Sequence, residues 1–302
     1  MQFGFPSLLD PGSETHIKIL SAWIKRCDNV QHLPADSDFV PTRLLVVGNE
    51  TSRRIHLVCN CHEKSLHYVA LSHRWGTPDQ EQPAEVRFSA TNKDSINKIK
   101  EGIEDTDLPK TFQDAVTITR KLRVKYLWID SLCVLQKKDE DEDSESKEDW
   151  DRESKLMGQV YSSAYFTIAA SCAEHRFHGF LKPRKPRQFV TMTADDGSQF
   201  HLCDVIDKFD SDVEQGELNK RGWVLQERAL SRRTMHFTET QTYWECGEGV
   251  WCETFTKTKK YVEFLSEIFF SAASLLTPVI AGKHLSSATL TFLILSMPIR
   301  KV

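Results

Sequence analysis

The chain has 302 residues, of which 27% are charged and 40% are hydrophobic, and its formal net charge is -4. These proportions are typical of a globular protein, and the slight negative charge gives no reason to expect a nucleic-acid partner. The eight cysteines are irregularly spaced and no secretory leader opens the chain, so we expect reduced thiols and a cytoplasmic location. The longest apolar stretch, residues 288–297, is half the roughly 20 residues of a membrane span, so no span is expected.

Residues 1–64 are expected to form a leader region and linker. Apolar residues at helical spacing predict a helix over 13–25. Two short β-type runs follow, 43–47 and 54–58, and a Gly-Asn turn signal separates them.

The next segments predict a strand, a helix and a second strand. The apolar run 67–72 continues directly into His73-Arg74-Trp75-Gly76. Thr111 is the expected N-cap of a helix over 111–123, which leads to a buried strand over 124–129 and then to Asp130. This order predicts a βαβ unit with a parallel sheet, in which ligands sit at the carboxyl ends of the strands. The polar residues after both strands are therefore candidate site residues.

A second helix is expected to begin at Trp150, after an acidic run over 139–148 that we interpret as a solvated loop. If Trp150 faces the core, Glu153 shares its side together with Met157 and Tyr161. A carboxylate on an apolar stripe is costly unless it is paired or lies in a cleft, which makes Glu153 a candidate site residue. The run 165–170 closes the unit as another buried strand.

The last recognisable segments are a short helix and β-type runs. Strands are expected over 188–193 and 199–205, and a β-hairpin over 234–238 and 241–246. Between them, residues 221–231 form a short expected helix in which Gln226 and Glu227 share the face of Trp223.

Three ordered groups of residues carry a family resemblance. Residues 68–76 (YVALSHRWG), 108–115 (LPKTFQDA) with 126–136 (YLWIDSLCVLQ), and 221–228 (RGWVLQER) with 243–246 (YWEC) resemble the three motifs of the fungal heterokaryon incompatibility (HET) domain. The resemblance implies a HET domain over 65–256 and a divergent C-terminal tail over 257–302. The acidic run is longer than the family's usual spacer.

The resemblance also implies a function and a fold. It implies a cytoplasmic effector of fungal non-self recognition and regulated cell death, which self-associates or responds to a non-self sensor protein. More distantly, it implies kinship with the Toll/interleukin-1 receptor (TIR) fold, some members of which cleave NAD. We expect an α/β fold with a mainly parallel sheet flanked by helices, a TIR/flavodoxin-like core, and an appended β-rich part.

The leading chemical hypothesis is cleavage of NAD as a substrate, with no cofactor and no metal. Such cleavage builds positive charge on a ribosyl ring, which a carboxylate stabilises. Glu153 is the first candidate and Asp130 the second. In TIR-type enzymes the glutamate also follows a tryptophan on a helix, at one residue's greater spacing. In the same hypothesis, the substrate-binding residues are Ser72, His73, Arg74, Trp75, Gln226 and Glu227.

Structural explanations exist for each candidate. In these alternatives, Glu153 pairs with an arginine such as Arg74, and Asp130 turns the chain at the strand end. Trp75 then packs in the core, and Arg74 pairs with Asp130 or Glu153. A Cys133–His73 nucleophile, a Ser72–His73–Asp130 triad and a zinc site at Cys59 and Cys61 are less favoured.

A non-catalytic, self-assembling signalling module is the alternative function. Convergence of the candidates on an open cleft would favour an enzyme, and closed pairs would favour the module.

Overall fold

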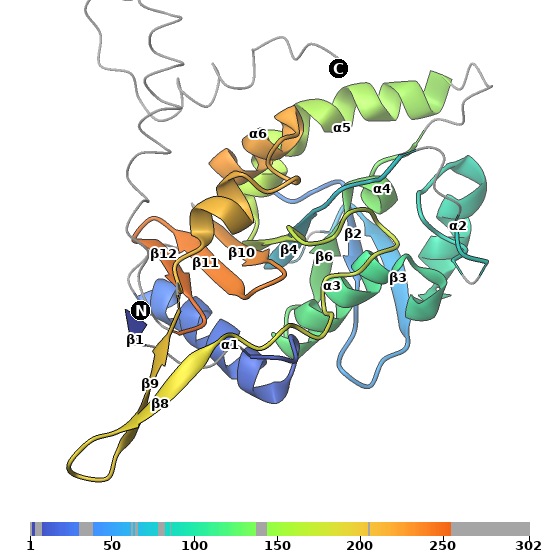
Figure 1. Ribbon diagram of the computed structural model, residues 1–302. Coiled ribbons are helices and arrows are strands. Elements are labelled where there is room, and N and C mark those ends of the chain that lie inside the picture. The colour runs from blue at the N-terminus through green and yellow to red at the C-terminus, as the bar shows by residue number, and fades with distance from the viewer. Residues whose placement is uncertain are drawn as a thin grey trace, which may run out of the picture.

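The computed structural model describes most of the chain (Figure 1). The described residues are 2–3, 8–29, 39–61, 63, 66–77, 82–84, 86–136, 144–204 and 206–254, without the side chains of residues 2, 3, 225 and 226. Within them, the helices are α1 (Glu14–Asn29), α2 (Lys93–Glu101), α3 (Lys110–Lys121), α4 (Asp130–Cys133), α5 (Ser144–Ser163) and α6 (Gly222–Leu230). None is long and apolar enough to cross a membrane.

A nine-stranded sheet forms the centre of the fold. Its strands are β2 (Arg43–Val46), β3 (Arg54–Cys59), β4 (Tyr68–Ser72), β5 (Ile103–Glu104), β6 (Tyr126–Trp128), β7 (Phe166–Ala169), β10 (Arg233–Phe237), β11 (Thr242–Cys246) and β12 (Gly249–Cys252). They lie in the order β12-β11-β10-β7-β4-β6-β2-β3-β5.

The sheet is mixed, so the expectation of a mainly parallel sheet is wrong. Only the pairs β10–β7, β7–β4 and β4–β6 are parallel. The five outer pairs are antiparallel. Short turns join β2 to β3 and β10 to β11, and such turns permit only antiparallel pairing. The α/β class is confirmed.

The four parallel strands determine where a site can form. They follow one another in the chain as β4, β6, β7 and β10, yet β6 and β7 lie on opposite sides of β4. The winding direction therefore reverses beside β4, and the carboxyl ends of strands at such a reversal are the usual ligand position in open α/β sheets. Helices α1 and α3 lie on one side of the sheet, and α5 and α6 on the other (Figure 1).

One core joins these layers. All residues of β4 and β7 are buried, and α3 contributes Phe112 and Ala115. Leu20 and Trp23 of α1 and Leu44 of β2 belong to the same cluster, so these two elements, which precede residue 65, pack within the fold.

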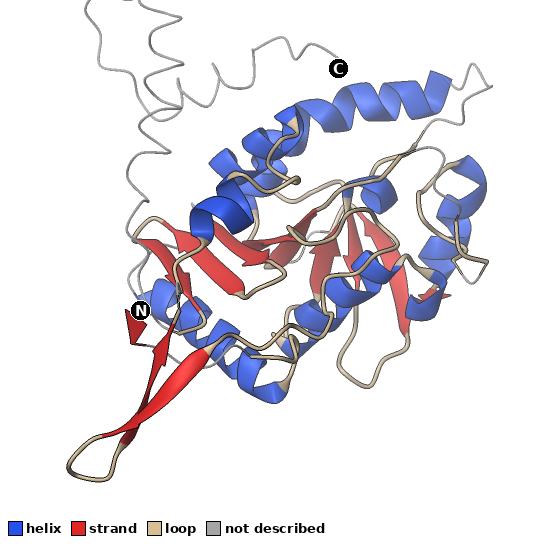
Figure 2. Cartoon of the chain, viewed as in Figure 1, coloured by secondary structure: helices blue, strands red, loops and turns tan. Residues whose placement is uncertain are grey.

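A second, three-stranded antiparallel sheet corresponds to the expected β-rich part. It has the order β1-β9-β8 and consists of β1 (Gln2–Phe3), β8 (Phe189–Thr193) and β9 (Gln199–Cys203). The β8–β9 hairpin extends away from the rest of the molecule (Figure 2). All five residues of β8 are exposed.

Two local expectations are wrong. Pro109, not Thr111, occupies the N-cap of α3, and the Thr111 hydroxyl instead donates to the carbonyl of His175 at 3.2 Å. Helix α5 begins at Ser144 rather than Trp150, and the Trp150 side chain is 38% exposed. The buried stripe of α5 runs through Asp149 and Glu153, one residue out of phase with Trp150. Asp149 is buried there because it pairs with the buried Arg43.

Candidate functional site

The carboxyl ends of β4 and β6 place polar residues from two motifs together. Asp130 follows β6, and its Oδ2 accepts a hydrogen bond from Trp75 Nε1 at 2.8 Å. Its Oδ1 accepts one from the backbone N–H of Ser131 at 2.7 Å and lies 3.8 Å from His73 Nδ1. The structure therefore brings Asp130, His73 and Trp75 together, and Asp130 also begins the short helix α4.

His73 is a buried, neutral imidazole. Burial lowers its pKa to about 4, the charge of Asp130 opposes this shift, and Arg176 and Arg221 add to it. The ring packs edge-on against Phe112, with 4.9 Å between centroids. Nδ1 faces Asp130, whereas Nε2 is buried with no hydrogen-bond partner among the described residues.

Helix α6 supplies a second carboxyl group, Glu227. The pKa of Glu227 is raised to about 7: burial is the main cause and the charge of Asp130 adds to it, while the hydroxyls of Ser72 and Tyr161 and the charge of Arg221 oppose the shift. A carboxyl with this pKa exchanges its proton near neutral pH. Arg221, at the N-cap of α6, donates from Nη1 to the carbonyl of His73 at 3.3 Å, which ties the helix to the end of β4.

Three polar atoms in this place are not satisfied by the described residues. Ser72 Oγ, His73 Nε2 and Glu227 Oε2 are buried and make no hydrogen bond of normal geometry with any described residue, although the Ser72 and Tyr161 hydroxyls lie close enough to Glu227 to lower its pKa. Buried polar groups in proteins are nearly always hydrogen-bonded, so a cluster of unpaired ones is typical of a site that a ligand or water completes.

Arg176 is a site residue that sequence reasoning missed. It lies in the loop after β7, and its guanidinium carbon is 5.2 Å from the centroid of the Trp75 ring. Its Nε donates to the Trp75 carbonyl at 3.0 Å. Strand β7 pairs in parallel with β4, so the loop after β7 begins at the same edge of the sheet as Trp75. This adjacency is the signal that could have indicated Arg176. Trp75 is thus held by Arg176 and Asp130, and stacking of a substrate ring on it stays a prediction.

Arg74 is paired with neither carboxylate, and its charge acts on Glu217 and His175 instead. It forms no hydrogen bond or ion pair with any residue that the structure describes, so the alternative pairing of Arg74 with Asp130 or Glu153 is not found. Phosphate binding by Arg74 stays a prediction. The side chain of Gln226 lies outside the described residues.

Glu153 belongs to a different cluster, which binds α5 to the sheet. Its Oε1 lies 3.1 Å from Arg152 Nε, and Arg152 also contacts Asp149. Arg43 of β2 forms two hydrogen bonds with Asp149, at 2.9 and 2.6 Å. Burial opposes ionisation of Asp149, but Arg43 and the N–H of Leu135 hold its pKa below its usual value.

Glu153 therefore has a cationic partner of its own, and Asp130 is not among its contacts. We expected an arginine such as Arg74 as the partner of Glu153, and in the structure the partner is Arg152. A catalytic role for Glu153 stays a prediction.

The Cys133 thiol is unsuited to nucleophilic catalysis. It is 1% exposed, and burial raises its pKa to about 12. A cysteine acts as a nucleophile through its thiolate, which such a pKa suppresses at neutral pH.

An ion cluster joins the two halves of the third motif. Arg228 of α6 donates twice to Glu245 of β11, at 2.8 Å each. It also donates twice to Glu214, at 3.0 and 2.8 Å. Glu245 Oε2 lies 2.7 Å from His236 Nε2. The cluster fixes α6, and with it Glu227, against the hairpin β10–β11.

Comparison with known proteins identifies one family. The heterokaryon incompatibility protein (HET) family matches residues 68–227, which run from the first residue of β4 to Glu227. No curated protein and no solved structure matches the chain. The match indicates an involvement in heterokaryon incompatibility, and since it covers more than half of the 302 residues, the chain belongs to the heterokaryon incompatibility protein (HET) family.

Proposed function

We propose that this chain is an effector of non-self recognition and regulated cell death, and that it acts by hydrolysing the N-glycosidic bond of NAD. The reaction converts NAD and water into ADP-ribose, nicotinamide and a proton. Two features support the proposal: the distant kinship with TIR-like proteins that the HET resemblance implies, and the spatial order of the four parallel strands, which agrees with the first four strands of flavodoxin-like folds.

The observation that carries the proposal is the group of unpaired, buried atoms on Ser72, His73 and Glu227 beside Asp130. They lie where open α/β sheets bind ligands, and a bound substrate would supply the missing partners.

Two carboxyl groups have separate roles in this proposal. Departure of nicotinamide leaves positive charge on the ribosyl ring, and Asp130, oriented by Trp75 and Ser131, stabilises that charge. Glu227 accepts a proton from the attacking water, which its pKa of about 7 permits near neutral pH. Neutral His73 offers Nε2 to the substrate. Glu227 here takes the catalytic role that we first expected for Glu153, because Glu153 is paired with Arg152.

The test is nicotinamide release by the purified full chain, measured by liquid chromatography. We expect Asp130→Asn and Glu227→Gln each to lower the rate by at least about 100-fold, which is the lower end of what an electrostatic stabiliser and a positioned acid–base group each contribute. Glu153→Gln should retain activity, and Glu101→Gln, a change to an exposed carboxylate, is the matched control. Circular dichroism verifies that each variant is folded.

The pH profile adds a second readout. A general base with a pKa of about 7 makes kcat/KM rise with pH up to about 7 and then level off. Glu227→Gln should abolish this inflection. Activity unchanged in Asp130→Asn and Glu227→Gln, or lost only in Glu153→Gln, would contradict the assignment.

A non-catalytic module that self-assembles is the second candidate, and strand β8, which is an edge strand among the described residues, favours it. Phe189, Val190 and Met192 are 43%, 51% and 43% exposed on this edge strand. Exposed apolar edge strands pair readily with strands of other chains. Absence of nicotinamide release, together with oligomers that grow with protein concentration and disappear in Val190→Lys, would establish this function instead.

A further inference from the structure

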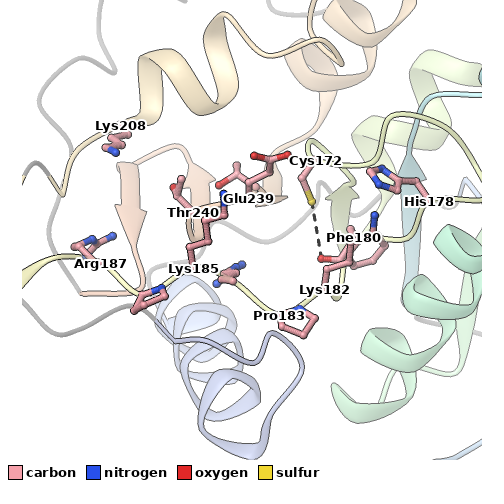
Figure 3. Close-up of a pocket in the computed structure, with 13 residues that line it drawn as sticks. Cys172, His178, Phe180, Lys182, Pro183, Lys185, Arg187, Lys208, Glu239 and Thr240 are labelled. Atoms are coloured by element: carbon pink, nitrogen blue, oxygen red, sulfur yellow. Dashed lines mark hydrogen bonds between the residues drawn. The ribbon is translucent and has the colours of Figure 1, made fainter.

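A pocket of about 450 Å³ lies apart from the Asp130 site. Its wall is formed by Cys172, His178, Phe180 and residues 182–187, by the turn 238–240 between β10 and β11, and by Lys208 (Figure 3). The loop after β7 separates the two places, because Arg176 contacts Trp75 while His178 and Phe180 line the pocket.

Positive charge dominates the pocket. Lys182, Lys185, Arg187 and Lys208 line it, against a single carboxylate, Glu239. Low-dielectric walls that carry charges of one sign concentrate counter-ions in a cleft. The excess of cations therefore favours an anionic occupant.

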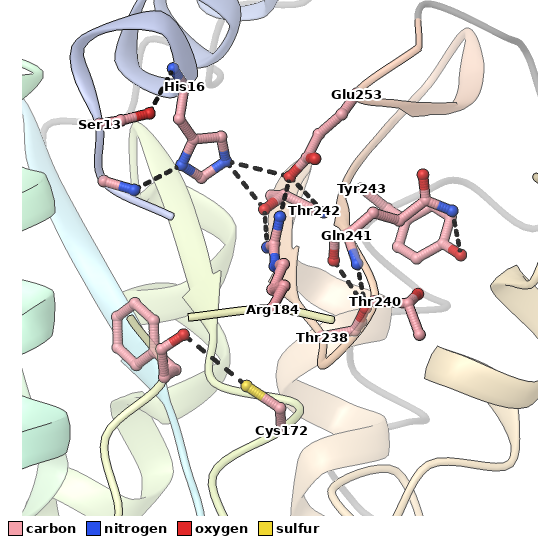
Figure 4. A network of polar contacts seen from close by, with 12 residues as sticks. Ser13, His16, Cys172, Arg184, Thr238, Thr240, Gln241, Thr242, Tyr243 and Glu253 are labelled. Carbon is pink, nitrogen blue, oxygen red and sulfur yellow. Dashed lines mark hydrogen bonds and ion pairs between the residues drawn. The ribbon is translucent and has the colours of Figure 1, made fainter. Parts of the chain in front are cut away.

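One of the arginines that line the pocket is buried and paired within the protein. Arg184 lines the pocket, and its side chain is 2% exposed. Its Nη1 contacts Glu253 Oε1 at 2.5 Å and its Nη2 donates to Thr242 at 2.8 Å (Figure 4). Glu253 thus balances Arg184, so the excess charge comes from the other four cations. Arg184 Nε is buried with no hydrogen-bond partner among the described residues.

The wall is also held in place before any ligand binds. The backbone N–H of Arg184 donates to the carbonyl of Leu9 at 2.8 Å, and Arg187 Nη2 donates to Gln241 at 3.2 Å. Pro183 and Pro186 restrict the backbone between them. A preformed pocket loses little conformational entropy on binding.

We infer that this pocket binds a phosphate-bearing ligand of nucleotide size. The volume falls within the range of small-molecule sites, about 300–1,000 Å³. Lysine ammonium groups act as point charges for phosphate oxygens, and the two prolines and Phe180 supply apolar wall for the rest of the ligand. The inference goes beyond the proposed function, since it requires no reaction at Asp130 or Glu227.

Isothermal titration calorimetry of the full chain tests the inference, with ATP in one arm and inorganic pyrophosphate in the other. We expect Lys182→Gln and Lys185→Gln each to weaken ATP binding by at least about tenfold, the equivalent of one charged hydrogen bond. Lys155→Gln is the matched control, because Lys155 is an exposed lysine on α5 outside the pocket. Added salt should weaken binding as well.

The outcomes separate clearly. Binding in both arms supports recognition through the phosphates, and binding of ATP alone supports a nucleotide whose organic part contacts the wall. No binding of either at millimolar concentration, or equal weakening by Lys155→Gln, would overturn the inference. Glu227→Gln should bind ATP as the wild type does, so loss of NAD cleavage in that variant leaves this test intact.

Discussion

Replacement of Arg228 by methionine should destabilise the protein severely. Arg228 is 7% exposed and makes four hydrogen bonds to Glu245 and Glu214. Methionine retains much of the packing of the side-chain stem but leaves Glu245, whose side chain is 11% exposed, without its cation. Loss of one partner of a buried ion pair costs about 3–5 kcal/mol. We therefore expect the free energy of unfolding to fall by about 4 kcal/mol, a large part of the usual 5–15 kcal/mol.

The pH dependence of this loss follows from Glu245. Burial opposes its ionisation, but Arg228 and His236 lower its pKa to about 2 from the usual 4.5. A folded-state pKa below the unfolded value gives stability that is present above about 4.5 and is lost as the pH falls towards 2. Without Arg228 the buried carboxyl takes up a proton at higher pH. The difference between variant and wild type should therefore be larger at pH 7 than at pH 4.

Urea denaturation followed by tryptophan fluorescence measures both quantities. Arg87→Met is the control, because Arg87 is 73% exposed and its ion pair with Asp107 should contribute less than about 1 kcal/mol. A loss in Arg228→Met no larger than in Arg87→Met, or one that is the same at pH 7 and pH 4, would refute the reasoning.

Two further predictions concern the core and the thiols. Phe112→Ala should lower the free energy of unfolding by about 3–5 kcal/mol, since the side chain is fully buried, whereas Phe189→Ala on exposed β8 should change it by less than about 0.5 kcal/mol in the same denaturation experiment. Exposed Cys59 should react with a thiol reagent in the native protein, while Cys133 should react only after unfolding; mass spectrometry of the labelled peptides would show it, and rapid native labelling of Cys133 would contradict its burial.

The strands and helices that carry the motifs could be predicted because their patterns are local. The continuous apolar runs of β4, β6 and β7 and the helical spacing of α3 are visible in the sequence. Helix α2 was missed because only Ile99 is buried among many charges. Its Asn92 N-cap with Ser95 and its Gly102 C-cap were the available signals.

What could not be predicted depends on partners far away in the sequence. Arg43 and Asp149 are separated by 106 positions, and no local pattern joins them. That pair explains why a carboxylate lies on the buried stripe of α5 in place of Trp150. The candidate site was predicted in part: the motifs placed Asp130 near His73, whereas the burial of Glu227 depends on how α6 is fixed by Arg228.

The packing of α1 has a consequence for synthesis of the protein. Trp23 stacks on Trp244, with 6.4 Å between centroids, and Asp28 pairs with Arg233 at 2.7 Å. This helix is synthesised before β10 and β11 and completes its contacts only when those strands have been made. At a synthesis rate of about 5–20 residues per second, the apolar face of α1 stays without these partners for roughly 10–45 seconds. During translation this face is a natural target for chaperones, and ribosomal pausing before β10 would lengthen that exposure.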